Sequence, residues 1–237
     1  MTRSTADSRP AQQRRSLIGG LSRRARTLPG RFANHVGGVN RRVRPDAVAL
    51  TFDDGPQPGS TDRILDILAE LDVRATFFCV GRNAEAHPEL VRRMRSEGHA
   101  VGSHSYTHPT PGDIPITTLA SEYAQGRRVV ADILGSHTAL FRPPHGHLTP
   151  TSAAIVRGQR LTPWLWTVDP EDWRPGVTSH HIEAVSGRAT GGDVVLLHDW
   201  VEEPWAPAAL DRSATVAALP GIVRAVRAQG LRLERLS

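Results

Sequence analysis

Two adjacent carboxylates, Asp53 and Asp54, stand in the stretch 51–56, which reads TFDDGP. They follow a short apolar run at 47–50 that predicts a buried strand, and the Gly-Pro pair ends it. Neighbouring like charges repel unless a cation lies near them, and successive strand residues point to opposite sides. One carboxylate can therefore face a metal ion while the other does different work. The simpler alternative is a turn whose carboxylates only cap the next helix.

Two histidines, His104 and His108, stand four residues apart in the stretch HSYTH. Two imidazoles at this spacing converge on one cation if the turn between them is helical. With one carboxylate they form a ligand set with open coordination positions, which both zinc hydrolases and non-haem iron oxygenases use. Because the chain has 11 histidines, such a pair also arises by chance. It becomes informative only beside Asp53 and Asp54.

Three later stretches add further candidate groups. Arg142, in FRPPHG, is a fixed positive charge that can orient a carboxylate, although a solvent-facing Arg on a rigid loop is the simpler explanation. Asp169 follows an apolar run and can hold a histidine in one tautomer. Trp173 is either a pocket wall or part of the core. His198 ends the most apolar run of the chain, where a histidine ordinarily bonds to a backbone carbonyl.

The elements that would position these residues alternate between strand and helix patterns from residue 45 onward. Strands are predicted at 47–50, 75–80, 99–103, 139–141, 163–168, 193–197 and 231–236. Helices are predicted at 64–71, 90–98, 117–134, after Pro150, at 179–189 and at 219–226. This alternation indicates an α/β fold with parallel strands and crossover helices. About seven strands without a glycine-rich dinucleotide motif favour a barrel, in which catalytic groups lie at the carboxyl ends of the strands.

Taken in order, the segments within 47–199 resemble the polysaccharide deacetylases, carbohydrate esterase family 4, also called the NodB-homology domain. TFDDGP, HSYTH and the LLH that ends in His198 carry most of this resemblance. It implies a distorted (β/α) barrel of about seven parallel strands. It also implies a hydrolase that removes N-acetyl groups from an acetylated amino sugar of the chitin-oligosaccharide, peptidoglycan or glycoconjugate type.

The resemblance assigns roles to the metal ligands and to the groups that move protons. It implies that Asp54, His104 and His108 hold a divalent ion, most often zinc and otherwise cobalt or nickel. Asp53 matches the catalytic base of the family. His198 matches its catalytic acid.

Five more positions match the supporting parts of the family's site. Arg142 matches the residue that positions the base, and Asp169 the residue that supports the acid. Trp173 and Leu196 match the walls of the pocket for the acetyl methyl group. His145 stands where the family commonly has Tyr. The backbone N–H of that position helps to hold the oxyanion in the family, and a histidine keeps this N–H.

The positive charge of the chain is concentrated at its start. Residues 1–44 contain 11 Arg and one Asp, whereas 45–237 contain 18 Arg against 23 acidic residues. We expect 1–44 to be largely disordered, as a solvated tail or with weak contact to an anionic surface. The net acidic segment 45–237 is expected to be the catalytic domain. Its charge argues against nucleic-acid binding.

The remaining features bear on the compartment and on other functions. Cys79 is the only cysteine, so no intramolecular disulfide can form, and its apolar surroundings predict a buried, inert thiol. Arg14-Arg15 lack a following apolar stretch, which leads us to expect a cytoplasmic protein, with export to the cell envelope as the alternative. The alternative functions are an O-acetyl esterase on carbohydrate, a hydrolase of another non-peptide amide, and a catalytically silent carbohydrate-binding barrel. The presence of both base and acid argues against the silent barrel.

Overall fold

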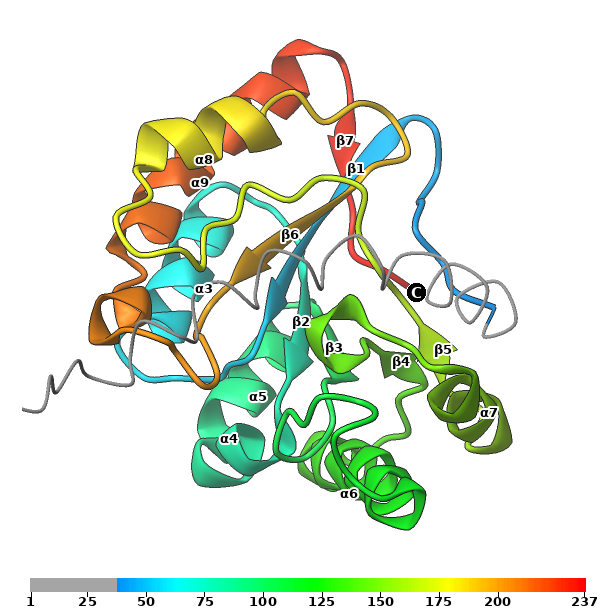
Figure 1. The fold of residues 1–237 in the computed structure, drawn as a ribbon. Coiled ribbons are helices and arrows are strands. Elements are labelled where there is room, and N and C mark those ends of the chain that lie inside the picture. The colour runs from blue at the N-terminus through cyan, green and yellow to red at the C-terminus, as the bar shows by residue number, and fades with distance from the viewer. Residues whose placement is uncertain (1–37) are drawn as a thin grey trace, which may run out of the picture.

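A curled sheet of parallel strands forms the centre of residues 38–237, the part that the computed structural model describes (Figure 1). Its strands are β1 (Ala47–Asp53), β2 (Thr76–Cys79), β3 (Ala100–Ser103), β4 (Leu140–Phe141), β5 (Thr162–Pro163), β6 (Val194–His198) and β7 (Arg232–Leu233). Their order in space is β5-β4-β3-β2-β1-β6, with β7 beside the start of β1. Every pairing is parallel. The sheet is therefore a half-barrel with β5 and β6 at its ends, which confirms the predicted distorted (β/α) barrel of about seven strands.

Helices connect the strands and cover the outside of the sheet. They are α3 (Thr61–Glu70), α4 (Gly81–Ala86), α5 (Pro88–Ser96), α6 (Ile116–Leu134), α7 (Pro150–Gly158), α8 (Ser179–Ser186) and α9 (Ser213–Ala228), with 3-10 helices η2 (Pro144–Gly146) and η3 (Pro207–Leu210). In Figure 1, α3, α8 and α9 gather on the side of β6, and α9 contacts both other helices. The short helix α4 and the two 3-10 helices are the members of this set that the sequence pattern did not predict.

The strand β1 is buried over its whole length because it pairs with β2 on one edge and with β6 on the other. Its alternate residues face different layers. Val48, Leu50 and Phe52 belong to the core beneath the helices, whereas Ala49 belongs to a cluster inside the sheet's curl. Burying each large apolar side chain contributes about 1.5–3 kcal/mol. By the same alternation Asp53 faces the inside of the curl.

The strand register brings the carboxyl ends of the strands to one edge. Asp53 pairs with His198 across β1 and β6, and Ser103 pairs with Phe141 across β3 and β4. The residues that follow β3 and β4 therefore begin beside one another, close to the end of β1. This is the edge at which the sequence places its candidate catalytic groups.

The predicted strand 163–168 is much shorter in the structure, where β5 ends at Pro163. Trp164 and Leu165 are buried, which explains the apolar pattern, but the chain then leaves β5 and crosses to β6. There Val168 makes an isolated parallel bridge to Val195. The predicted length was wrong because burial with only isolated bridges, at Trp164 to Asn40 and at Val168, gives the same apolar pattern as a continuous strand.

The predicted Arg-rich segment 1–44 lies mostly outside the described residues. Of its described part, Asn40 donates its backbone N–H to the carbonyl of Pro163 at 2.9 Å, and Arg42 pairs with Asp193 at 3.0 Å. Residues 40–44 therefore pack on the rest of the described structure. Cys79 is buried, as expected. Among the helices of 38–237, none combines the length and apolar character needed to cross a membrane.

Candidate metal centre and active site

Asp54, His104 and His108 meet at the carboxyl ends of β1 and β3, and all three are buried. Their ligand atoms all lie within 4.8 Å of one another. The Nε2 atoms of His104 and His108 each lie 3.5 Å from Oδ1 of Asp54. One carboxylate oxygen and two imidazole nitrogens could hold a metal ion, and three protein ligands of this kind leave positions open for water and substrate.

The hydrogen bonding and the pKa shifts of the three ligand residues fit a bound cation. Oδ1 of Asp54 is buried and has no hydrogen-bond partner in the protein. Burial raises the pKa of Asp54 to about 7 and lowers that of His104 to about 3. Burial also lowers the pKa of His108. The histidines are thus neutral, which is the form that binds metal, and a divalent ion would stabilise the charged form of Asp54.

The backbone conformation at the strand ends orients the side chains of the three ligands. Asp54 has φ 78° and His108 has φ 62°, conformations that non-glycine residues seldom adopt. The segment from His104 to His108 is irregular, with Ser105 Oγ accepting the N–H of His108 at 2.9 Å. The histidines therefore converge through a tight turn, whereas the sequence argument relied on a helical one. Nδ1 of His104 lies 2.7 Å from the carbonyl oxygen of Arg142, which leaves Nε2 for the metal.

Asp53 is held by Arg142, as predicted from the resemblance. Nη1 of Arg142 donates to Oδ1 of Asp53 at 2.7 Å and to Oγ1 of Thr51 at 2.8 Å. The Arg142 side chain is fully buried and lies over the Phe78 ring, 4.3 Å from its centroid. Burial raises the pKa of Asp53, and the charge of Arg142 opposes this effect. Oδ2 of Asp53 remains directed at the triad, 3.6 Å from Nε2 of His104.

His198 is held by Asp172, and not by Asp169 as the sequence analysis expected. Nδ1 of His198 lies 2.7 Å from Oδ1 of Asp172, whose Oδ2 accepts the backbone N–H of His198 at 2.9 Å. Burial alone would lower the pKa of His198, but Asp172, together with the charges of Asp54 and Asp53, raises it to about 9. The ring is therefore protonated at neutral pH, with Nδ1 occupied and Nε2 available to the pocket.

Asp169 and Asp172 differ in exposure because the loop after residue 168 folds back on the end of β6, where Asp172 contacts His198. Asp172 is 1% exposed, whereas Asp169 is exposed and accepts the backbone N–H of Glu171 at 2.8 Å. Asp169 follows the predicted strand 163–168, which in the structure ends at Pro163. The only sequence signal for Asp172 is its place directly before Trp173.

A pocket of about 520 Å³ opens over these groups. Nine of the ten predicted site residues line it. These are Asp53, Asp54, His104, His108, His145, Asp169, Trp173, Leu196 and His198. Arg142 lies buried behind Asp53. The structure thus brings the whole predicted set to one place.

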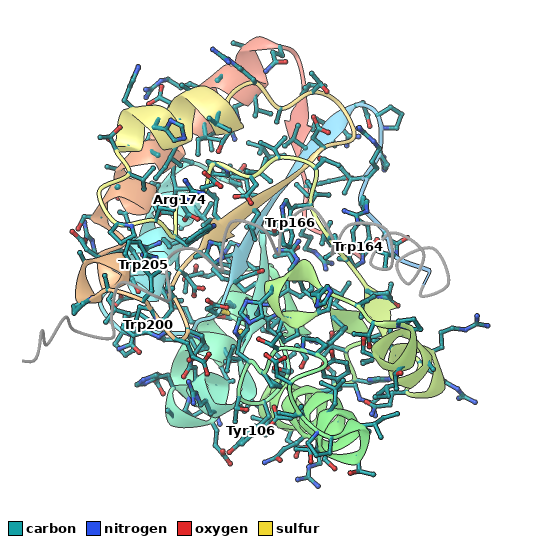
Figure 2. All side chains as sticks on the ribbon, viewed as in Figure 1. Tyr106, Trp164, Trp166, Arg174, Trp200 and Trp205 are labelled. Carbon is teal, nitrogen blue, oxygen red and sulfur yellow. The ribbon has the colours of Figure 1, made fainter. Side chains whose placement is uncertain are left out.

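Other walls of this pocket were not predicted from the sequence. Trp166 forms one of them, and the segment after β6 contributes Glu202, Glu203 and Trp205. Trp166 and Trp205 can be followed in Figure 2. Trp205 is 74% exposed, an unusual state for so large an apolar side chain. Loops carry no periodic pattern, so the sequence gives no signal for these residues.

His145 stands at the rim of the pocket with φ 56°. Its ring lies 4.5 Å from the His108 ring, centroid to centroid, in an edge-to-face arrangement. His145 therefore packs on a predicted metal ligand while its own ring is exposed. The use of its backbone N–H for an oxyanion stays a prediction.

Comparisons with known proteins agree with this geometry. Residues 40–164 match the family model described as "Polysaccharide deacetylase". A peptidoglycan-N-acetylglucosamine deacetylase of Bacillus cereus is 35% identical over 193 residues, which cover 80% of this chain and 86% of that protein. A chitooligosaccharide deacetylase of Azorhizobium caulinodans is 33% identical, with 80% and 92% covered.

A solved structure shows the same fold. The family 4 carbohydrate esterase from Streptomyces lividans, in complex with acetate, superposes with a TM-score of 0.73 at 34% identity. The match covers 82% of this chain and 95% of the esterase. The chain belongs to the polysaccharide deacetylase family, carbohydrate esterase family 4.

Proposed function

We propose that this protein is a metal-dependent hydrolase that removes N-acetyl groups from an acetylated amino sugar. The observation that carries the proposal is the arrangement of two proton-transfer groups around the metal triad. Asp53, paired with Arg142, ends β1, and His198, paired with Asp172, ends the neighbouring strand β6. Relatives named as deacetylases of peptidoglycan and of chitooligosaccharides support this assignment.

The residues Asp54, His104 and His108 would hold the metal ion. When bound, a divalent ion polarises a carbonyl and lowers the pKa of a water molecule. The mixed set of one oxygen and two nitrogens suits Zn²⁺, with Co²⁺ and Ni²⁺ as further possibilities.

Asp53 acts as the general base in this proposal. Arg142 occupies its Oδ1, so Oδ2 is the oxygen left to take a proton from the attacking water. The fixed guanidinium also favours the charged carboxylate and opposes the rise in pKa that burial causes. A positioned base of this kind contributes about 10²- to 10⁴-fold to the rate.

His198 acts as the general acid. An amide nitrogen leaves only after it has been protonated, because its anion is a very poor leaving group. Asp172 keeps His198 protonated at neutral pH and fixes the ring through Nδ1. An ester needs this acid far less, since an alkoxide leaves more readily. The buried His198–Asp172 pair therefore favours N-deacetylation over O-deacetylation.

The walls of the pocket fit an acetylated sugar. Leu196 and Trp173 line it and supply the apolar surface that we assign to the acetyl methyl group. Trp166 and Trp205 add flat apolar faces, against which the C–H groups of a sugar ring can pack. The backbone N–H of His145 is assigned to the developing oxyanion.

Acetate release from a panel of substrates tests the proposal. The zinc-loaded full chain is incubated with N-acetylated sugars from one to six units and with O-acetylated sugars, beside the Asp53→Asn variant as a matched control. We expect acetate from the N-acetylated sugars, and far less from the variant. Acetate from O-acetylated sugars alone would establish the esterase. No acetate from any substrate, with zinc bound, would contradict the proposal and favour the silent carbohydrate-binding barrel.

We also propose that the protein acts in the cytoplasm, on an acetylated carbohydrate found there. Cell fractionation followed by immunodetection tests this location. Recovery with the cell envelope or the medium would contradict it.

A further inference from the structure

The metal ligand Asp54 is held by two contacts that come from other segments. The backbone N–H of Glu202, in the segment after β6, donates to Oδ2 of Asp54 at 2.9 Å. The side-chain amide of Asn83, in α4, donates to the backbone carbonyl of Asp54 at 2.8 Å. Both contacts restrain a residue whose positive φ is unfavourable. Asp54 is therefore kept in place from outside its own strand.

The Glu202 side chain ties these two segments together. Its carboxylate contacts the guanidinium of Arg82 and the side-chain amide of Asn83. Its side chain is only 4% exposed, whereas that of Arg82 is 45% exposed. Partners of this kind offset the cost of removing a carboxylate so far from water. We call Arg82, Asn83 and Glu202 the Asp54 clamp.

The clamp decides which oxygen of Asp54 meets the two histidines. Oδ2 is occupied by the N–H of Glu202, whereas Oδ1 has no hydrogen-bond partner and faces His104 and His108. If the segment after β6 moved away, Oδ2 would lose its partner and the carboxylate could rotate. The carboxylate of Glu202 itself points to Arg82 and Asn83. Glu202 therefore acts on Asp54 and is not itself a metal ligand.

We propose that Glu202 is a positioning residue for the metal ligand Asp54, and that its ion pair with Arg82 and its contact with Asn83 keep its backbone N–H on Oδ2. This inference rests on the metal role of Asp54 in the proposed function. Partners of metal ligands typically change metal affinity by about 10- to 100-fold when they are substituted. The clamp also joins the metal centre to the segment that contributes Trp205 to the pocket wall.

Zinc affinity, measured on metal-free protein by competition with a chromophoric chelator, tests the clamp. Glu202→Gln removes the charge at nearly constant shape, and we expect zinc to bind about 10- to 100-fold more weakly. Glu203→Gln is the matched control, because it removes the same charge from the adjacent pocket residue that makes none of the clamp contacts. We expect its affinity to stay within about twofold of the wild type, by the small effect of exposed charges.

Arg82→Ala gives an independent arm at a side chain that is already half exposed. It should weaken zinc binding in the same way, and Arg82→Lys should restore part of the affinity. The double variant Arg82→Ala/Glu202→Gln should lose less than the sum of the two single losses, since both act through one ion pair. Thermal unfolding of the metal-free proteins shows whether each variant is folded.

The outcomes separate this inference from the proposed function. If Glu202→Gln and Arg82→Ala bind zinc as tightly as the wild type, the clamp has no positioning role. Equal weakening by Glu203→Gln would likewise overturn it, because the effect would then come from local charge alone. If the wild type binds no zinc, the proposed function itself fails.

Discussion

The imidazole of His198 and the carboxylate of Asp172 form a buried pair, with Nδ1 of the histidine 2.7 Å from Oδ1 of the acid. Oδ2 of Asp172 accepts two further hydrogen bonds, from the His198 N–H and from the hydroxyl of Thr215, both at 2.9 Å. This arrangement fixes the ring and stabilises its charged form. It gives His198 the properties that a general acid needs at neutral pH.

Replacement of Asp172 by Asn should move the alkaline limb of the pH–rate profile to lower pH. Asp172 is the largest of the acidic contributions that raise the pKa of His198 to about 9 against the effect of burial, so its removal should lower that pKa. A general acid works only while protonated, and activity should then be lost at a lower pH. The profile of kcat/KM between pH 6 and pH 10 measures this shift.

Asp169→Asn is the control for that experiment, since it leaves the pair between His198 and Asp172 in place. The alkaline limb of the Asp169→Asn pH–rate profile should lie at the same pH as that of the wild type. A shifted limb in Asp169→Asn together with an unshifted one in Asp172→Asn would return the supporting role to Asp169.

Replacement of Asp53 by Asn should separate catalysis from metal binding. Asn cannot take a proton, so kcat should fall by about 10²- to 10⁴-fold. Zinc affinity should change little, because the three ligands of the triad remain. Acetate release and calorimetric zinc titration on the same preparation check both halves. Near-normal turnover would exclude Asp53 as the base.

Removal of the metal should abolish activity and lower the melting temperature. A ligand that binds only the folded state stabilises it by about 2.7 kcal/mol at 100 times its dissociation constant. Added Zn²⁺ should restore both the activity and the melting temperature of the wild type. It should raise the melting temperature of His108→Gln far less, because this variant lacks one ligand. Calorimetry with and without a chelator measures the shift. An equal zinc-induced rise in the variant would contradict a role for His108 as ligand.

Trp205→Ala should affect long substrates more than short ones. The exposed ring at the pocket wall is placed to pack on a sugar beyond the one that reacts. Loss of an aromatic contact worth about 0.5–1.5 kcal/mol lowers kcat/KM by about 2- to 12-fold. The test compares a tetrasaccharide with a monosaccharide, and Ile116→Ala, at an exposed apolar residue outside this pocket, should change neither rate. Equal losses on both substrates would argue against an extended binding surface.

The sequence predicted the parts of the fold that regular burial determines. β1 and β6 are both buried along almost their whole length, so their apolar runs identified them. The run at 163–168 misled because Trp164 and Leu165 are buried, whereas beyond Pro163 the chain makes only isolated bridges at Trp164 and Val168. Periodicity reports burial, and it does not report which backbone groups are paired.

Local sequence patterns also fail to report which residues are paired in the site. The motifs around Asp53, His104 and His198 named the groups that meet at the strand ends. Asp172 and Glu202 act through loops that fold back on those ends. Their contacts join positions far apart in the chain, and no local pattern records such a pairing. Here only the structure identifies the partner.

Anomalous diffraction at the zinc edge, from crystals of the zinc-loaded protein, tests the central claim most directly. We predict one strong peak per chain, bound by a carboxylate oxygen of Asp54 and by Nε2 of His104 and of His108. A peak elsewhere, or none within bonding distance of those three atoms, would contradict the assignment of this centre and the hydrolytic role built on it.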